Sequence, residues 1–443
     1  MMFGTFAEQR HFTYPQKESY HGIFINANMA AYAPDGIAKF IQTKTSPPNR
    51  YIIDPQTHAF QHNPKHIQGS NDQLKKSIVN LVEQYGDPIK GIAGERPLSH
   101  RDMTPPNQIL LVENCIRFQR DFLKSRMESS EDRKYTTFES YELTMSPYAL
   151  IAPYFFLQET TYNNWLEINI NLVDQTINKL ESGEMCFAMV VLGRGILTNS
   201  EAFDEIVSKY RETNVHGFIV WIDDLPEFDS GSAELNGLLK LACKLNAGCK
   251  EVINLHGSYF SVLATNPNWK QSSFTGVCHG PEFGEYRSVV PVGGGIPIAK
   301  FYIPSLHNRV RYKEAVNLFR GNGYLKSADV FYKNVCNCDE CRKNIKNDPE
   351  KLFIMYGESS ISHRRTKFGI VSIEYPTAET KLRCLRHYLQ RKNIEYINAK
   401  SKSLYELKNE IDYGISEFCE DYIGYLSLWK KSLWEILNKP ATK

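Results

Sequence analysis

The sequence predicts an α/β protein, a TIM-type (β/α)8 barrel followed by a helical C-terminal unit. Short apolar runs that end in polar residues alternate with stretches whose apolar residues recur at helical spacing, which is typical of a parallel sheet. Beyond about residue 325 this alternation stops, and a cysteine cluster and long helical patterns follow. We therefore expect a barrel domain over residues 1–325 and a separate unit over residues 326–443.

The alternation runs through most of the first domain. Strands are expected over residues 21–29, 50–60, 145–156, 186–196, 215–224, 250–264 and 274–280. Helices are expected over residues 70–86, 113–127, 163–183, 199–214 and 232–248. The stretch 95–108 is expected to be a loop. Together these segments fit about eight α/β units of one barrel.

Two further segments complete the pattern. Residues 289–309 are rich in glycine and proline, and are expected to form a functional loop that leaves the last strand. Residues 377–397 and 401–437 have strongly helical patterns. The second unit is therefore expected to be mainly helical.

Composition limits the class of protein. Of the 443 residues, 42% are apolar, enough for a large core, and no window reaches the roughly 20 apolar residues that a membrane span needs. The N-terminus has no basic segment followed by an apolar one, so we expect a cytoplasmic protein without membrane contact. Residues 300–400 hold 20 Lys and Arg against 10 Asp and Glu, whereas the rest holds 32 against 40. A basic block of this kind favours a polyanionic partner.

The cysteine cluster predicts a metal site. Cys336, Cys338 and Cys341 stand within six residues, so one tight turn can direct three thiols at one ion. Zn²⁺ binds thiolates tetrahedrally, and a site with four protein ligands is structural. The fourth ligand is expected to be His387, on a predicted helix, with His363 as the alternative.

Beyond this cluster, the sequence resembles the tRNA-guanine transglycosylase family, whose barrel carries a CxCxxC…His zinc site. The segments IIDPQTHAF, VWIDDLPEF, NLHGSYFS, HGPEFGEYR and RHYLQRKNIE are similar to the branch that inserts 7-deazaguanines into DNA. The family's DSGGFQ corresponds here to DPQTHAFQ, and its GGLAVGE is absent. The resemblance implies a pentosyltransferase that exchanges guanine in DNA for a base such as preQ0, with structural zinc.

Acidic residues at the ends of predicted strands are the candidate catalytic groups, because barrel enzymes carry their chemistry there. They are Asp54, Asp223, Asp224 and Glu285. Base exchange with retention needs one carboxylate that attacks the sugar and a second group that moves a proton. The resemblance gives Asp54 one of these roles, and it leaves open which of the other three is its partner.

Polar and aromatic residues at the same strand ends are candidates for binding the base. They are Gln56, His58, Arg194, His256, Tyr259, His279, Arg287 and Gly294, the last in a glycine run that lets backbone amides approach a ligand. The candidates for phosphate contact are Arg309, Arg311, Lys313, Arg342, Lys343, Arg364 and Arg365.

Three alternatives remain open at this point. The substrate could be tRNA, which the basic block fits as well as it fits DNA. The chain could instead be a catalytically silent nucleic-acid-binding subunit of a modification complex, acting with other subunits. A base-removing glycosylase differs only in that water completes the reaction.

Overall fold

The protein is seen here in a computed structural model that describes residues 2–3, 20–45, 50–127, 146–280, 284–290, 298–366, 369–418 and 420–439. The chain forms two compact units. The first comprises Met1–Arg10, Tyr20–Pro291 and Lys431–Lys443, and the second comprises His11–Ser19 and Val292–Lys430. The second unit therefore includes residues 292–325, which the sequence analysis groups with the barrel domain.

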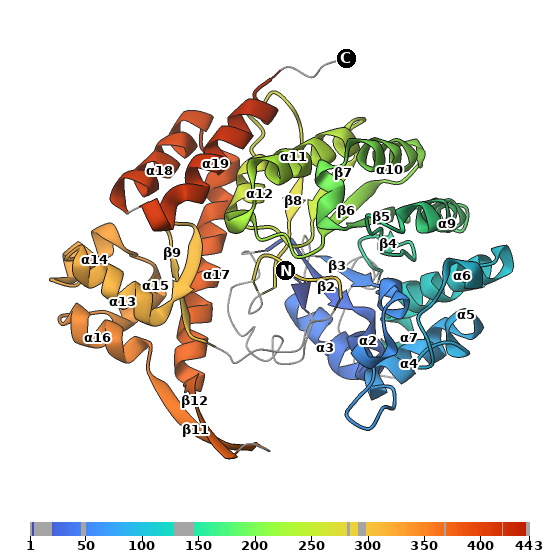
Figure 1. The fold of residues 1–443 in the computed structure, drawn as a ribbon, viewed down its shortest axis with the longest axis horizontal. Coiled ribbons are helices and arrows are strands. Elements are labelled where there is room, and N and C mark those ends of the chain that lie inside the picture. The colour runs from blue at the N-terminus through green and yellow to red at the C-terminus, as the bar shows by residue number, and fades with distance from the viewer. Residues whose placement is uncertain are drawn as a thin grey trace. The chain divides into compact units, whose positions relative to one another are not determined.

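Parallel strands form the centre of the first unit (Figure 1). They pair in chain order as β1-β2-β3 and as β4-β5-β6-β7-β8. Their bounds are β1 (Met2–Phe3), β2 (Gly22–Asn26), β3 (Arg50–Asp54), β4 (Leu150–Ile151), β5 (Cys186–Leu192), β6 (Gly217–Ile222), β7 (Glu251–Asn254) and β8 (Gly276–Val277). Every residue of β5 and β6 is buried, as expected for parallel strands covered on both faces. The α/β class is thus confirmed.

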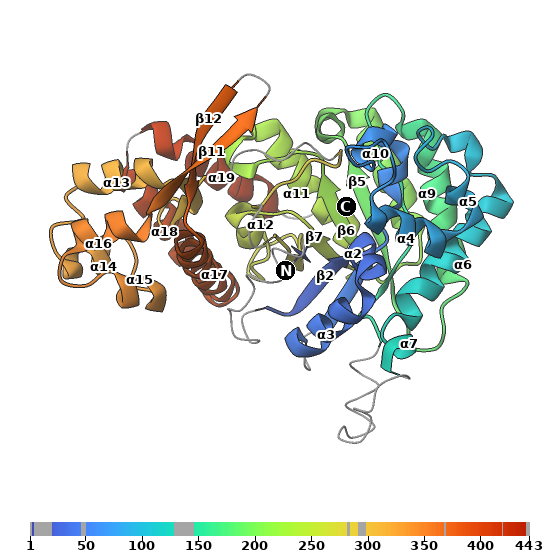
Figure 2. The same ribbon diagram turned by 90° about the horizontal axis from the view of Figure 1, so that it is seen from below.

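Helices follow the strands and lie on the outer side of the sheets in this unit (Figure 2). They are α2 (Ala27–Tyr32), α3 (Pro34–Lys44), α4 (Lys76–Tyr85), α5 (Asp87–Lys90), α6 (Pro105–Asp121), α7 (Lys124–Met127), α9 (Tyr162–Ile177), α10 (Ser200–Glu212), α11 (Ser232–Asn246) and α12 (Tyr259–Ala264). The loop expected over 95–108 ends earlier than predicted. Pro105 begins α6, because proline lacks an N–H that the first helical turn would leave unpaired.

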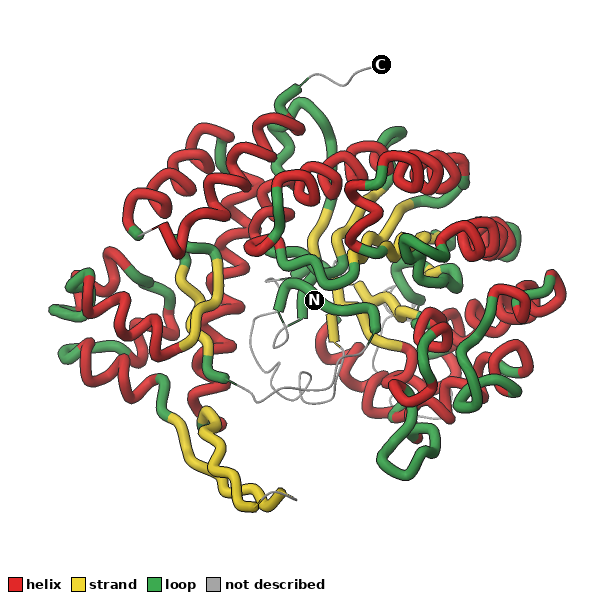
Figure 3. The backbone as a smooth tube through the Cα atoms, viewed as in Figure 1, coloured by secondary structure: helices red, strands yellow, loops and turns green. Residues whose placement is uncertain are grey.

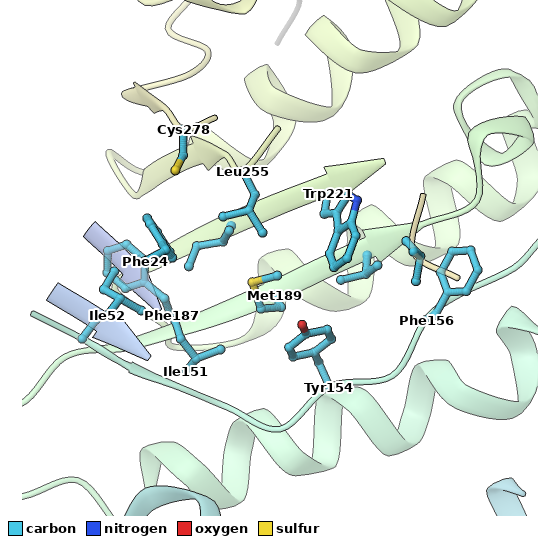
Figure 4. Packing of buried hydrophobic residues seen from close by; sticks show 14 residues of the cluster. Phe24, Ile52, Ile151, Tyr154, Phe156, Phe187, Met189, Trp221, Leu255 and Cys278 are labelled. Carbon is cyan, nitrogen blue, oxygen red and sulfur yellow. The ribbon is translucent and has the colours of Figure 1, made fainter. Parts of the chain in front are cut away.

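One apolar core joins the two parallel sheets (Figure 4). Phe24 of β2 and Ile52 of β3 pack in the same buried cluster as Met189 of β5 and Trp221 of β6. Between the sheets, the Tyr148 N–H donates to the Tyr51 carbonyl at 2.8 Å. The ladders among the described residues do not close into one barrel, so this structure establishes a five-stranded parallel sheet beside a three-stranded one.

The second unit is mainly helical, with two β-hairpins (Figure 3). Its elements are β9 (Lys300–Ile303), β10 (Asn308–Arg311), α13 (Tyr312–Gly321), α14 (Ala328–Asn334), α15 (Asp339–Asn344), α16 (Pro349–Tyr356), β11 (Ser359–Thr366), β12 (Gly369–Pro376), α17 (Ala378–Ser401), α18 (Leu404–Glu417) and α19 (Glu420–Leu437), whose last residues belong to the first unit. The helices expected after residue 377 are present. Residues 300–309, expected within a loop, belong to the β9–β10 hairpin instead.

The described helices include none that is both long and apolar enough to cross a lipid bilayer.

Candidate functional site

Asp54 is the last residue of β3 and is 1% exposed. Its Oδ1 accepts hydrogen bonds from the Tyr154 hydroxyl at 2.8 Å and from the Gln56 backbone N–H at 3.0 Å. Its Oδ2 is buried and has no hydrogen-bond partner among the described residues. Burial raises the pKa of this carboxyl to about 6, although both hydrogen bonds and the charge of Arg287 act to lower it. The structure therefore fixes one oxygen of Asp54, while the other keeps an unused capacity to accept or, when protonated, to donate a hydrogen bond.

The local turn explains how Asp54 is held. Gln56 adopts a left-handed φ of 53°, which turns its N–H back toward the carboxyl two residues earlier. Thr57 then ties this turn to the segment after β4, since its hydroxyl donates to the Tyr154 carbonyl at 2.5 Å and accepts from the Tyr154 N–H at 2.9 Å. The Tyr85 hydroxyl donates to the Pro55 carbonyl. Two strand ends are thereby fixed against each other.

A row of buried rings continues from Asp54. The ring of His58 stacks on Tyr154 with centroids 5.2 Å apart and meets Trp221 edge-on at 5.2 Å. Trp221 in turn meets His256, which follows β7, at 5.1 Å. His58 Nδ1 and His256 Nε2 are buried and have no partner among the described residues. These rings bring together residues of β6 and of the segments that follow β3, β4 and β7.

Both imidazoles are neutral near neutral pH. Burial, helped by the charges of His62 and Arg287, lowers the pKa of His58 well below its ordinary value. Burial, with the charge of Arg287, lowers the pKa of His256 to about 3. A neutral imidazole carries one N–H donor and one acceptor, so each histidine can recognise a neutral polar edge of a ligand.

Arg287 is the cation of this cluster. Its positive charge acts on Asp54, His58 and His256. Its carbonyl accepts from the Trp221 indole N–H at 3.0 Å, which fixes the segment that carries it against β6. The structure therefore brings Asp54, Gln56, His58, His256 and Arg287 together, as expected for one site.

The other candidate acids lie in different surroundings. Asp223 is half-buried, accepts from the Val289 N–H at 2.7 Å, and has a pKa raised by burial. Asp224 is exposed, with a left-handed φ of 44°.

Glu285 is buried, and its charge acts on the buried carboxyl of Glu227. The Ser258 and Ser261 hydroxyls donate hydrogen bonds to that Glu227 carboxyl. Among the described residues, Arg287 is the charged group that acts on Asp54.

The remaining candidates for base binding are engaged elsewhere or lie outside the described part. The guanidinium of Arg194 forms a two-point ion pair with Glu234. Tyr259 is buried at the start of α12. His279 is buried, with Nδ1 3.2 Å from the Gly280 carbonyl. Gly294 lies outside the described residues.

Three residues of the site were missed by the sequence analysis. Asn26 ends β2 directly beside Asp54 in the parallel ladder, and its buried Oδ1 has no partner among the described residues. Tyr154 and Trp221 hold Asp54 and the histidines as described above. A polar residue after the apolar run GIFI was a signal for Asn26, whereas tyrosine and tryptophan inside apolar runs look like core.

The second unit brings together the four residues of the predicted metal site. Cys336, Cys338, Cys341 and His387 are buried, and their ligand atoms all lie within 4.8 Å of one another. The distances from His387 Nδ1 to the three Sγ atoms are 3.8, 3.3 and 3.4 Å in chain order. This cluster could hold a metal ion. His363 lies exposed on β11, 2.9 Å from the Ser372 hydroxyl, and is not part of it.

The surroundings of His387 fix its orientation. Its Nε2 lies 2.7 Å from the Tyr302 carbonyl on β9, which makes Nε2 the protonated nitrogen and leaves Nδ1 as the free ligand atom. The Phe301 ring stacks on the imidazole with centroids 4.3 Å apart. The histidine is therefore preset to face the three sulfur atoms.

Neither a known protein-family model nor a curated protein matches this chain.

Proposed function

We propose that this chain is a guanine transglycosylase-like enzyme that exchanges guanine in DNA for a 7-deazaguanine base such as preQ0. The observation that carries the proposal is Asp54, a carboxyl buried at a strand end, with one oxygen held and the other without a hydrogen-bond partner among the described residues. Neutral imidazoles and aromatic rings surround it, which suits a flat, polar, uncharged heterocycle. The choice of base exchange as the reaction follows from the resemblance of the sequence to the tRNA-guanine transglycosylase family.

We infer that the first unit is a (β/α)8 barrel. Eight strands, β1 to β8, run parallel in chain order, and residues of both sheets share one core. Asn26, Asp54 and the segment with His256 all stand at carboxyl ends of strands. In barrels of this type the active site is built at that end.

Asp54 acts in this proposal as the group that moves the proton. A pKa raised to about 6 by burial lets a carboxyl keep a proton near neutrality, as a general acid requires. The proton on Oδ2 passes to the departing guanine as its bond to the sugar C1′ breaks. In the second step Asp54 takes a proton from the incoming 7-deazaguanine, whose nitrogen forms the new bond to C1′.

Glu285 is our candidate for the attacking carboxylate. It is buried, whereas Asp223 is only half-buried and Asp224 is exposed. It also lies two residues before Arg287, whose charge acts on Asp54. Attack of Glu285 on C1′ would form an ester, which the incoming base then displaces, so the sugar keeps its configuration.

Zinc is the metal that best fits the second unit. With Zn–S near 2.3 Å and Zn–N near 2.0 Å, a tetrahedral centre places sulfur and nitrogen about 3.5 Å apart. The observed separations of 3.3 to 3.8 Å bracket that value. Because four protein ligands close the site, zinc would stabilise the fold and take no part in the exchange.

Release of labelled guanine tests the proposal directly. We expect the purified protein to release guanine from labelled duplex DNA, and only when preQ0 or another 7-deazaguanine is added. The measurement is labelled base freed per enzyme, with bulk tRNA as the parallel substrate. Release from tRNA alone would contradict the choice of DNA. Release without added base would indicate a glycosylase, and no release from either would favour a silent binding subunit.

The pH dependence of the same reaction tests the role of Asp54. If Asp54 must begin protonated, the single-turnover rate should fall by up to about tenfold per pH unit above pH 6, because its pKa is about 6. DNA affinity at each pH, measured by fluorescence anisotropy, is the control. A rate that instead rises through pH 6 would show that Asp54 reacts as the carboxylate, and would contradict its role as the acid.

A further inference from the structure

The β11–β12 hairpin of the second unit projects from its helices (Figures 1 and 3). The strands pair antiparallel from Ser359 opposite Pro376 to Thr366 opposite Gly369. The base of the hairpin is fixed, since Lys313 pairs with Glu374 at 2.8 Å and the Thr380 hydroxyl donates to the Glu358 carbonyl at 2.7 Å. These two strands are not among those predicted from the sequence.

One face of the hairpin carries apolar and basic groups together. Because side chains alternate along a strand, this face holds Ile361, His363, Arg365, Ile370, Ser372 and Glu374. Ile361 and Ile370 are 68% and 73% exposed. Arg365 stands directly opposite Ile370 near the end of the hairpin, and it has no ion-pair partner among the described residues. A guanidinium and an aliphatic side chain thus lie side by side in solvent.

Three other candidates for phosphate contact in this unit are already engaged. Lys313 pairs with Glu374, Arg311 approaches Glu314 at 3.8 Å, and the Arg309 guanidinium lies 4.4 Å from the Tyr388 ring centroid. Arg365 therefore remains the exposed cation on this face, within a chain region that carries 20 basic residues against 10 acidic ones. That charge is complementary to a polyanion.

We propose that the β11–β12 hairpin is a DNA-binding arm, which enters a groove of duplex DNA with Arg365 against the backbone and Ile370 pressed between base steps. The choice of DNA rests on the proposed function. A two-stranded ribbon fits a groove of B-form DNA, and apolar wedges beside arginine are how proteins kink a duplex. A protein that takes a base out of the stack gains from such a kink, because unstacking is part of its energetic cost.

The test uses the full chain and a duplex of about 30 base pairs, labelled at both ends with a fluorescence donor and acceptor. Arg365→Ala should weaken the affinity about tenfold and reduce the salt dependence by roughly one phosphate contact. Ile370→Ser should remove most of the change in energy transfer that reports bending. Matched controls are Arg211→Ala on α10 and Ile397→Ser on α17, where Ile397 is 57% exposed. Both controls should behave as wild type.

Two outcomes would contradict the proposal that the hairpin is a DNA-binding arm. If Arg365→Ala and Ile370→Ser bind and bend the duplex as wild type does, the hairpin does not contact DNA. If Ile370→Ser leaves DNA binding intact but shifts the sedimentation coefficient to a smaller species, the hairpin is an interface between copies of this chain.

Binding and bending are read without any deazaguanine, so this test is separate from that of the proposed function. Hairpin-dependent bending by a protein that releases no guanine would support the arm and contradict the transglycosylase. If both hairpin variants release guanine and bend the duplex as wild type does, the transglycosylase is supported and the DNA-binding arm is contradicted.

Discussion

Replacing Asp54 by Asn should abolish guanine exchange, with a loss of at least about a thousandfold in the single-turnover rate. The amide keeps the size of the carboxyl and an oxygen for the hydrogen bonds from Tyr154 and Gln56. It cannot deliver a proton from the position of Oδ2. The measurement is labelled guanine release from duplex DNA in the presence of preQ0, with enzyme in excess.

Stability separates this chemical effect from unfolding. In the wild type, a pKa of about 6 against an ordinary 3.8 means that the folded state holds its proton more tightly than the unfolded state does. The contribution of Asp54 to the free energy of unfolding therefore falls as pH rises from 3.8 to 6, by about 3 kcal/mol, and is then constant. The Asp54→Asn protein lacks this loss. We expect its stability relative to wild type to rise over that pH range in denaturant titrations.

The control for this substitution is Asp121→Asn, at the exposed end of α6, which should leave the rate unchanged. If the Asp54→Asn protein exchanges guanine at the wild-type rate, Asp54 is removed from the mechanism. If the substitution prevents folding, the denaturant titration will show it, and the loss of activity will not be mistaken for a catalytic defect.

Replacing Cys338 by Ser should remove the metal and unfold the second unit. Cys338 is the N-cap residue of α15 and contributes one of four buried ligand atoms. A structural zinc site supplies on the order of 10 kcal/mol to the folded state. We expect less than about a tenth of the metal per chain by elemental analysis, with loss of a cooperative thermal transition and poor solubility.

Cys249→Ser provides the matched comparison, because Cys249 is an exposed cysteine of the first unit and is remote in sequence from the cluster. That protein should keep its full metal content and melt as wild type does. A soluble Cys338→Ser protein with one metal ion per chain would show that the cluster is not the metal site.

Much of the first unit could be predicted, because its signal is local. Apolar runs such as those of β5 and β6 are buried on both faces, so the sequence itself carries the pattern of a parallel strand. Asp54 could be found because a carboxylate directly follows such a run. The cysteine spacing likewise predicted the cluster that the fold assembles with His387.

The rest depended on contacts between distant residues. Tyr154 is 100 positions from Asp54, and nothing near it in the chain distinguishes it from a core aromatic. Glu285 and Asp224 look equivalent in the sequence, and only burial separates them. The β11–β12 hairpin was missed because Ser359–Thr366 is almost entirely polar and reads as a loop, although residues 371–375 of its partner strand alternate apolar and polar side chains.

Strand β9 has a consequence for the cooperativity of the second unit. Tyr302 serves two networks at once, because its carbonyl lies against His387 while its hydroxyl donates to Glu395, which also bonds His307 and pairs with Lys392. Those three charged or titratable side chains are buried. Displacement of β9 would release the ligand histidine and expose an internal ion pair in the same event. The metal centre and the buried ion pair should therefore open as a single unit, so that partial unfolding of one without the other is suppressed.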